Sequence, residues 1–237
     1  MTSRQSNIIF YSVISIIIYA LVLNFSNPEF FENFSKSKEE LSIKEAVNSG
    51  EHNKALVIYQ QLVEERINDD NEINVETAAM YEDMANLYSL IGNKAEEKNY
   101  YLKSLKIKEQ LKKNDMFGFA KTYFKLGLIT QEEGQYDSAQ IYYEKSLSKR
   151  LGDPEQVKEA DTGMITGMHQ TRLNYIRLNN EATITTLKKL GAIHNIKKEY
   201  TIAKKYYDKA LTASKITFGE DAAETLDLMD LIKRLAL

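Results

Sequence analysis

Apolar residues recur at helical spacing over most of this sequence, and glycines interrupt the pattern at regular intervals. Gly50, Gly92 and Gly134 each end one apolar-periodic stretch and precede another, and they stand 42 residues apart. The stretch after each glycine ends in an aromatic-rich stripe: ALVIYQQLV, NYYLKSL and IYYEKSL. A fixed period of this size is typical of helical arrays. We therefore predict a series of helical hairpins, each a helix, a short turn and a second helix.

A fourth copy, LKKLGAIHNIKKEYTIAKKYYDKAL, keeps the pattern but has Lys198 at the turn position. Gly127 and its counterpart Gly191 are 64 residues apart, so 22 extra residues interrupt the period. We assign them to an insertion at 152–181, in which Pro154 suits the start of a helix. The insertion is either a repeat that has drifted or a dedicated binding feature, and the sequence leaves both open.

The small and aromatic positions of these copies resemble those of the tetratricopeptide repeat, and the 42-residue period resembles the long repeats of kinesin light chains. In the third copy the matching positions are Tyr123, Leu126, Gly127, Gly134, Tyr136, Ala139, Tyr143 and Leu147. The resemblance implies an all-α fold, a right-handed superhelical solenoid of antiparallel helix pairs, and a function in binding proteins. In this family Gly127 and Gly191 face a partner helix, so we expect close helix contacts at both.

The repeat phase sets the expected boundaries of the solenoid. It extends over 36–219, and the C-terminal stretch 220–237 is predicted to be a capping helix with Asp221 as its N-cap. The expected repeats are approximately 36–70, 77–113, 119–151 and 184–217.

The N-terminal segment 7–25 is apolar and contains no charge, which predicts a transmembrane helix between a short tail, 1–6, and a juxtamembrane linker, 26–35. A cleaved signal peptide and a buried core helix are the alternatives. Arg4 lies nearer the span than the lysines that follow it. The positive-inside rule then places the repeats on the non-cytoplasmic side, periplasmic or extracellular.

Composition excludes several kinds of functional site. The chain has no cysteine, which excludes disulfides, thiolate metal sites and lipid attached through cysteine. Its formal charge of −3 is not that of a nucleic-acid-binding protein. The three histidines lack zinc-ligand spacing, and His194 is predicted to be a packed ring. We expect no catalytic, cofactor or metal site and no enzymatic activity.

The first helix of each hairpin lines the concave groove in the family that this sequence resembles, and the repeat phase assigns residues to it. Only Asn86 and Lys188 fit the carboxylate clamp of chaperone-binding members, so a mixed groove is expected instead. We predict that Phe124 and Leu128 are exposed apolar anchors there. The candidate protein-binding residues are Glu82, Asn86, Lys121, Phe124, Leu128, Gln131, Lys188 and Asn195.

These features predict a membrane-anchored scaffold or adaptor that binds a peptide or protein subunit. A fixed structural or assembly subunit of a larger membrane complex is the alternative, and an enzyme accessory or sensor fragment is a third. Charge is uneven along the array: residues 29–98 hold 16 acidic and 7 basic residues, whereas residues 181–216 hold 8 basic and 3 acidic. Opposite signs at the two ends leave head-to-tail homo-oligomers open.

Overall fold

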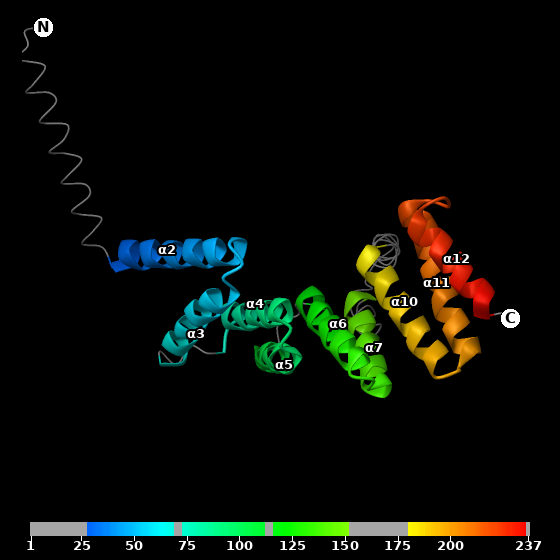
Figure 1. Cartoon of the computed structure of the whole chain (residues 1–237), viewed down its shortest axis with the longest axis horizontal. Helices are drawn as coiled ribbons and strands as arrows, with labels where there is room; N and C mark the ends of the chain where they lie inside the picture. The colour runs from blue at the N-terminus through cyan, green and yellow to red at the C-terminus, as the bar shows by residue number, and fades with distance from the viewer. Residues whose placement is uncertain (1–27, 69–72, 112–115, 152–179, 236–237) are drawn as a thin grey trace, which may run out of the picture. The chain divides into compact units, whose positions relative to one another are not determined.

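The computed structural model describes residues 28–68, 73–111, 116–151 and 180–235, and its regular secondary structure in these ranges is α-helical (Figure 1). The chain divides into two compact units, Met1–Asn68 and Asp69–Leu237. The predicted extent of the solenoid, 36–219, includes residues of both units and stays a prediction.

The first unit contains hairpin 1, made by α2 (Pro28–Asn48) and α3 (His52–Asn68). Described residues of α2 start at Pro28, so part of the segment that the sequence assigns to a linker, 26–35, is helical. Among the described residues of this unit, the buried apolar side chains are Ile43, Ala46, Ala55, Leu56 and Val63.

The second unit contains three further hairpins and a terminal helix. Helix α5 packs on α6, and α7 packs on α10, so consecutive hairpins are stacked side by side (Figure 1). Hairpin 2 consists of α4 (Val75–Ile91) and α5 (Lys94–Leu111), hairpin 3 of α6 (Met116–Glu132) and α7 (Tyr136–Leu151), and hairpin 4 of α10 (Glu181–Ile196) and α11 (Tyr200–Phe218), followed by α12 (Ala223–Leu235).

The turns between paired helices use a left-handed residue at the position that the period predicts. Gly92 and Gly134 have φ of 84° and 73°, a region that glycine enters without steric cost. Lys198 has φ of 61° at the equivalent position of hairpin 4, where it is the one non-glycine residue with positive φ in the described ranges. Its amide and that of Glu199 hydrogen-bond the carbonyls of Asn195 and His194 at 2.9 and 2.8 Å. The predicted alignment of the fourth copy is therefore confirmed.

Close contacts at Gly127 and Gly191 are also confirmed. A Cβ atom on Gly127 would lie 2.7 Å from the ring of Tyr143, and one on Gly191 would lie 2.6 Å from the ring of Tyr207. Both tyrosines are on the second helix of the same hairpin, so the missing side chain lets the paired helices approach each other. Hairpin 2 has Ala85 at this position, where the repeat also accepts a methyl group.

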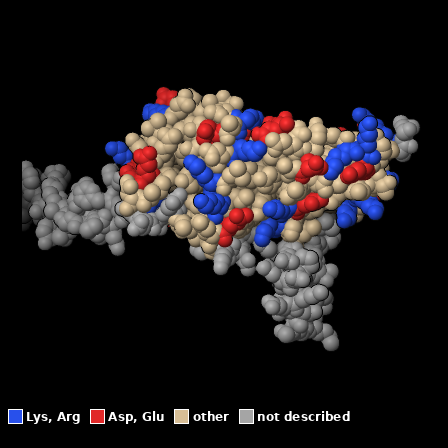
Figure 2. All heavy atoms as spheres, turned by 90° about the horizontal axis from the view of Figure 1, so that it is seen from below, with Lys and Arg blue, Asp and Glu red and all other residues tan. Residues whose placement is uncertain are grey.

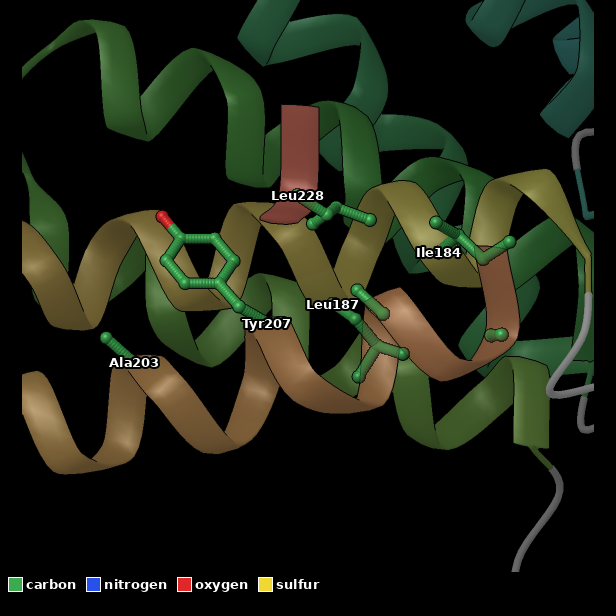
Figure 3. Close-up of a cluster of buried hydrophobic side chains, with 7 residues drawn as sticks. Ile184, Leu187, Ala203, Tyr207 and Leu228 are labelled. Atoms are coloured by element: carbon green, nitrogen blue, oxygen red, sulfur yellow. The ribbon is translucent and has the colours of Figure 1, made fainter. Parts of the chain in front are cut away.

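The core of hairpin 4 continues into the terminal helix. Ile184 and Leu187 of α10, Tyr207 of α11 and Leu228 of α12 are buried against one another (Figure 3). Helix α12 thus covers apolar surface that hairpin 4 would otherwise expose. The carbonyl of Ala222 accepts the first helical bond of α12, from Leu226, so Ala222 rather than Asp221 is at the N-cap position.

Two predicted features lie largely outside the described residues. The transmembrane segment 7–25 is one, and almost all of the insertion 152–181 is the other. Among the helices that the structure describes, none combines the length and the apolar character that crossing a membrane requires.

Candidate protein-binding site

Glu82 belongs to a buried polar cluster between hairpins 2 and 3. Its Oε1 lies 2.6 Å from Nζ of Lys108, and it accepts a hydrogen bond from the hydroxyl of Thr122 on α6. Nζ of Lys108 also donates to the Gly118 carbonyl at 3.2 Å and to Thr122 at 3.0 Å. The Glu82 carboxylate therefore connects side chains of three helices, α4, α5 and α6.

Phe124 and Leu128 are half-buried, in contrast to the exposed anchors that the sequence predicts. The Phe124 ring lies 5.6 Å, centroid to centroid, from that of Tyr143. Both side chains pack against a buried cluster that includes Leu190 and Ile193 of α10. Phe124 and Leu128 thus lie on the side of α6 that faces hairpin 4. Substituting either residue would affect packing as well as any binding surface.

Other predicted groove residues also have partners within the protein. Asn86 accepts a hydrogen bond from the Tyr101 hydroxyl at 2.6 Å, and Gln131 accepts one from Tyr143 at 2.7 Å. Burial raises the pKa of both tyrosines well above the ordinary value, so each remains a neutral donor at physiological pH. Lys188 forms an ion pair with Asp227 of α12.

Lys121 and Asn195 are exposed, as expected for a binding surface. The exposed or partly exposed positions on one side of α4, α6 and α10 form what we call the first-helix face: Ala79, Asp83, Lys121, Lys125, Thr185 and Lys189. Of these, the sequence-based assignment missed Asp83, Lys125 and Lys189. The repeat phase places Ala79, Lys121 and Thr185 on this side of the first helices, and each missed residue follows one of them by four residues, about one helical turn. That spacing could have identified the missed residues from the sequence.

The turn edge of the second unit is held by ion pairs between neighbouring hairpins. Lys94 lies 2.8 Å from Glu132, and Lys98 lies 2.5 Å from Glu133. At the next boundary, Lys197 of the α10–α11 turn lies 2.8 Å from Asp137 at the start of α7. Glu132 and Glu133 therefore form ion pairs that connect hairpins 2 and 3.

His194 is a packed ring, as predicted from the repeat. It is 4% exposed, and its ring stacks on that of Tyr206 with centroids 5.3 Å apart. Its Nδ1 lies 2.5 Å from Oε2 of Glu199. Among the described residues, no three His, Asp or Glu side chains converge as a metal site requires.

One pocket opens between hairpins 3 and 4, with a volume of about 460 Å³. Phe124 of α6 and Arg150 of α7 line it together with residues at the start of α10, namely Asn180, Glu181, Ala182 and Thr185. On the face of the molecule that Figure 2 shows, basic and acidic side chains are interspersed. This face therefore has no broad region of one charge sign, and recognition of a partner there would depend on the local arrangement of charges.

Comparisons with known proteins identify the hairpins. One tetratricopeptide-repeat family model matches residues 78–111 and 120–148, and a second model of that repeat matches residues 183–221. No curated protein matches the sequence. Solved structures show the same type of fold at low sequence identity, and they are similar in architecture only.

BtubC (BKLC) from P. vanneervenii is 18% identical with a TM-score of 0.52, over 83% of the present chain and 65% of that protein, so the chain spans less than two thirds of its length. A Podosopora anserina protein described as a putative kinesin light chain, with nearly identical tetratricopeptide-like repeats, is 12% identical with a TM-score of 0.59, over 84% of both chains. A variant of that protein with one substitution gives the same values. Hairpins 2, 3 and 4 are therefore tetratricopeptide repeats, arranged in an all-α helical-repeat solenoid.

Proposed function

We propose that this chain is a membrane-anchored scaffold that binds a protein partner through its tetratricopeptide repeats. Such repeats are protein-interaction modules, and the first-helix face is the surface that this chain would use. The N-terminal segment 7–25 would hold the repeats close to a bilayer, on its non-cytoplasmic side. The partner would be a protein or peptide segment with acidic side chains.

The unpaired lysines of the first-helix face carry this proposal. Lys121, Lys125 and Lys189 form no ion pair within the described part of the chain, whereas the turn-edge cations are paired with carboxylates of neighbouring hairpins. Cations that have no internal partner remain available to an acidic segment, and charge complementarity of this kind favours specificity and rapid association.

Charge reversal on the first-helix face tests the proposal. The double variant Lys121→Glu with Lys125→Glu should lose partner recovery from detergent extracts while its circular dichroism melt stays unchanged. The matched control is Lys106→Glu, because Lys106 is an exposed lysine on the second helix α5. Equal recovery by the double variant and the control would exclude the first-helix face as the binding surface.

The same experiment distinguishes two forms of scaffold. A partner recovered in fixed stoichiometry after size-exclusion chromatography would indicate a structural subunit of a membrane complex. A partner that exchanges within minutes when an isotopically labelled extract is added would indicate an adaptor. Neither outcome depends on knowing the partner in advance.

The apolar run without charge at residues 7–25 supports the anchor, and the position of Arg4 supports the orientation. Protease added to intact cells or spheroplasts tests both. We expect external protease to digest the repeats. In membranes without protease, we expect the protein to be retained after a carbonate wash. Protection of the repeats until the membrane is lysed would reverse the proposed orientation.

A further inference from the structure

Equivalent positions at the boundaries between successive hairpins hold different polar and charged side chains. The boundary between hairpins 2 and 3 contains a complete buried ion pair. Lys108 of α5 lies 2.6 Å from Glu82 of α4, and Thr122 of α6 hydrogen-bonds the same carboxylate. Both charged side chains are about nine-tenths buried, with exposures of 10% for Lys108 and 12% for Glu82. The cation at this boundary therefore has its anion within the protein.

The next boundary keeps the cation and lacks the anion. Arg150 of α7 is 42 residues after Lys108 and so takes its place, but Phe124, 42 residues after Glu82, replaces the carboxylate. Thr186 is at the position of Thr122, and its hydroxyl donates to the Ala182 carbonyl at 2.7 Å. Between hairpins 3 and 4 the repeat thus retains a guanidinium and a threonine, with an aromatic ring where the carboxylate would be.

Arg150 has no counterion within the described residues. Its Nε is buried without a hydrogen-bond acceptor there, and burial lowers the pKa of the guanidinium. Glu181 also lines the pocket but forms no ion pair with it, and the side-chain oxygen of Asn180 is already used to accept the Thr183 amide at 2.9 Å. A partly desolvated charge without an anion is unfavourable. A carboxylate that enters the pocket would therefore form a favourable ion pair with the Arg150 guanidinium.

The boundary after hairpin 4 shows that a missing pair is not general in this chain. There Lys188, at the position of Phe124, is ion-paired with Asp227 of α12. Ser214, at the position of Arg150, lies 2.8 Å from the hydroxyl of Thr225. The polar groups at this boundary therefore have partners on the following helix.

We propose that the pocket between hairpins 3 and 4 receives a glutamate side chain from a protein partner, whose carboxylate pairs with Arg150 as Glu82 pairs with Lys108. The guanidinium would bind the carboxylate through two parallel N–H donors, and the ring of Phe124 would contact the methylene groups. A volume of about 460 Å³ is sufficient for one side chain with its adjoining backbone. This inference rests on the proposed scaffold function and specifies the chemistry of the partner.

The test uses the full chain in detergent and two capped tripeptides, N-acetyl-Ala-Glu-Ala-amide and its glutamine counterpart. The readout is the Nε–H resonance of Arg150 in a proton–nitrogen correlation spectrum, assigned with Arg150→Lys. We expect the glutamate peptide to shift this resonance to saturation, and the glutamine peptide to bind at least about tenfold more weakly, because a charged hydrogen-bonded pair is lost. Equal affinity for the two peptides would overturn the proposal.

Two variants give independent readouts. Phe124→Glu supplies the carboxylate from within and should abolish peptide binding. Arg150→Gln preserves much of the length of the side chain while removing its charge. Because this variant lacks the Arg150 Nε–H group, its peptide binding is measured by isothermal titration calorimetry, and its affinity for the glutamate peptide should fall to that for the glutamine peptide. Circular dichroism establishes that each variant is folded, and unchanged peptide binding by a folded Arg150→Gln variant would contradict the assignment.

A control separates this site from the first-helix face. Lys121→Gln should reduce partner recovery and leave tripeptide binding unchanged, so each proposal can fail alone. If Arg150 responds to neither peptide, and neutralising the acidic residues of 152–179 shifts its Nε–H resonance, then the chain's own carboxylate fills the pocket. That result would overturn binding of a partner glutamate. No response to either perturbation would exclude a carboxylate site altogether.

Discussion

The buried pair between hairpins 2 and 3 makes the sharpest stability prediction. Replacing Lys108 with methionine keeps an unbranched side chain of similar length and removes the charge. Glu82 then has no cation, and the Gly118 carbonyl and the Thr122 hydroxyl each lose a donor that lies 3.2 and 3.0 Å away in the native protein. The variant should therefore be strongly destabilised.

The burial of the pair sets the size of this effect. Exposures of 10% and 12% give little screening by solvent, and breaking one member of a buried pair costs about 3 to 5 kcal/mol. The surface pair Lys54–Glu51 is the matched comparison. With exposures of 65% and 54%, it belongs to a class worth about 0 to 1 kcal/mol, so Lys54→Met should have a small effect.

Urea denaturation and amide hydrogen exchange give the required measurements. Because repeat arrays are held together by nearest-neighbour interfaces, the loss should appear first as faster exchange in α5 and α6. Replacing both members, with Glu82→Leu and Lys108→Met, should recover most of the lost stability, since no charge remains buried alone. A loss below about 1 kcal/mol for Lys108→Met would show that the pair is solvated and the reasoning wrong.

Three further predictions concern the turns, the helix contacts and the anchor. Gly127→Leu should lower the free energy of unfolding by about 1 to 3 kcal/mol, because Tyr143 already occupies the space that the new side chain needs; an unchanged urea midpoint would contradict this. Lys198→Gly should raise stability by up to about 1 kcal/mol and Gly134→Lys should lower it by a similar amount, since both positions are left-handed; calorimetry that finds the opposite order would refute the turn assignment. Deleting residues 1–27 should release a helical protein into the supernatant, and a truncated protein that still pellets with washed membranes must attach by another route.

The hairpins could be predicted from the sequence because their signals are local. Gly92 and Gly134 mark turns that need a left-handed residue, and the alignment of the fourth copy, 64 residues after the third, places Lys198 at the same conformation. The close approach at Gly127 follows from its place in the repeat. Each of these features depends on one hairpin alone, so periodicity suffices to locate it.

The surfaces between hairpins could not be predicted in the same way. Periodicity shows which side of α6 faces its own second helix, but the neighbouring hairpin determines whether Phe124 is exposed or packed. The repeat phase assigns Glu82 to the groove, but the partner that buries it, Lys108, is 26 residues away on another helix. Arg150 was missed for the same reason, since its significance appears only when one boundary is compared with the next.

Site-specific photo-crosslinking in native membranes tests the central claim most directly, because it reports which surface of the scaffold touches a partner. A photoreactive amino acid is placed at Lys121 on the first-helix face or, in a separate variant, at Lys106 on α5. We predict one discrete adduct of defined mass from position 121 and none from position 106. Adducts of equal yield from both positions, or none from position 121, would contradict a scaffold that binds through its first helices.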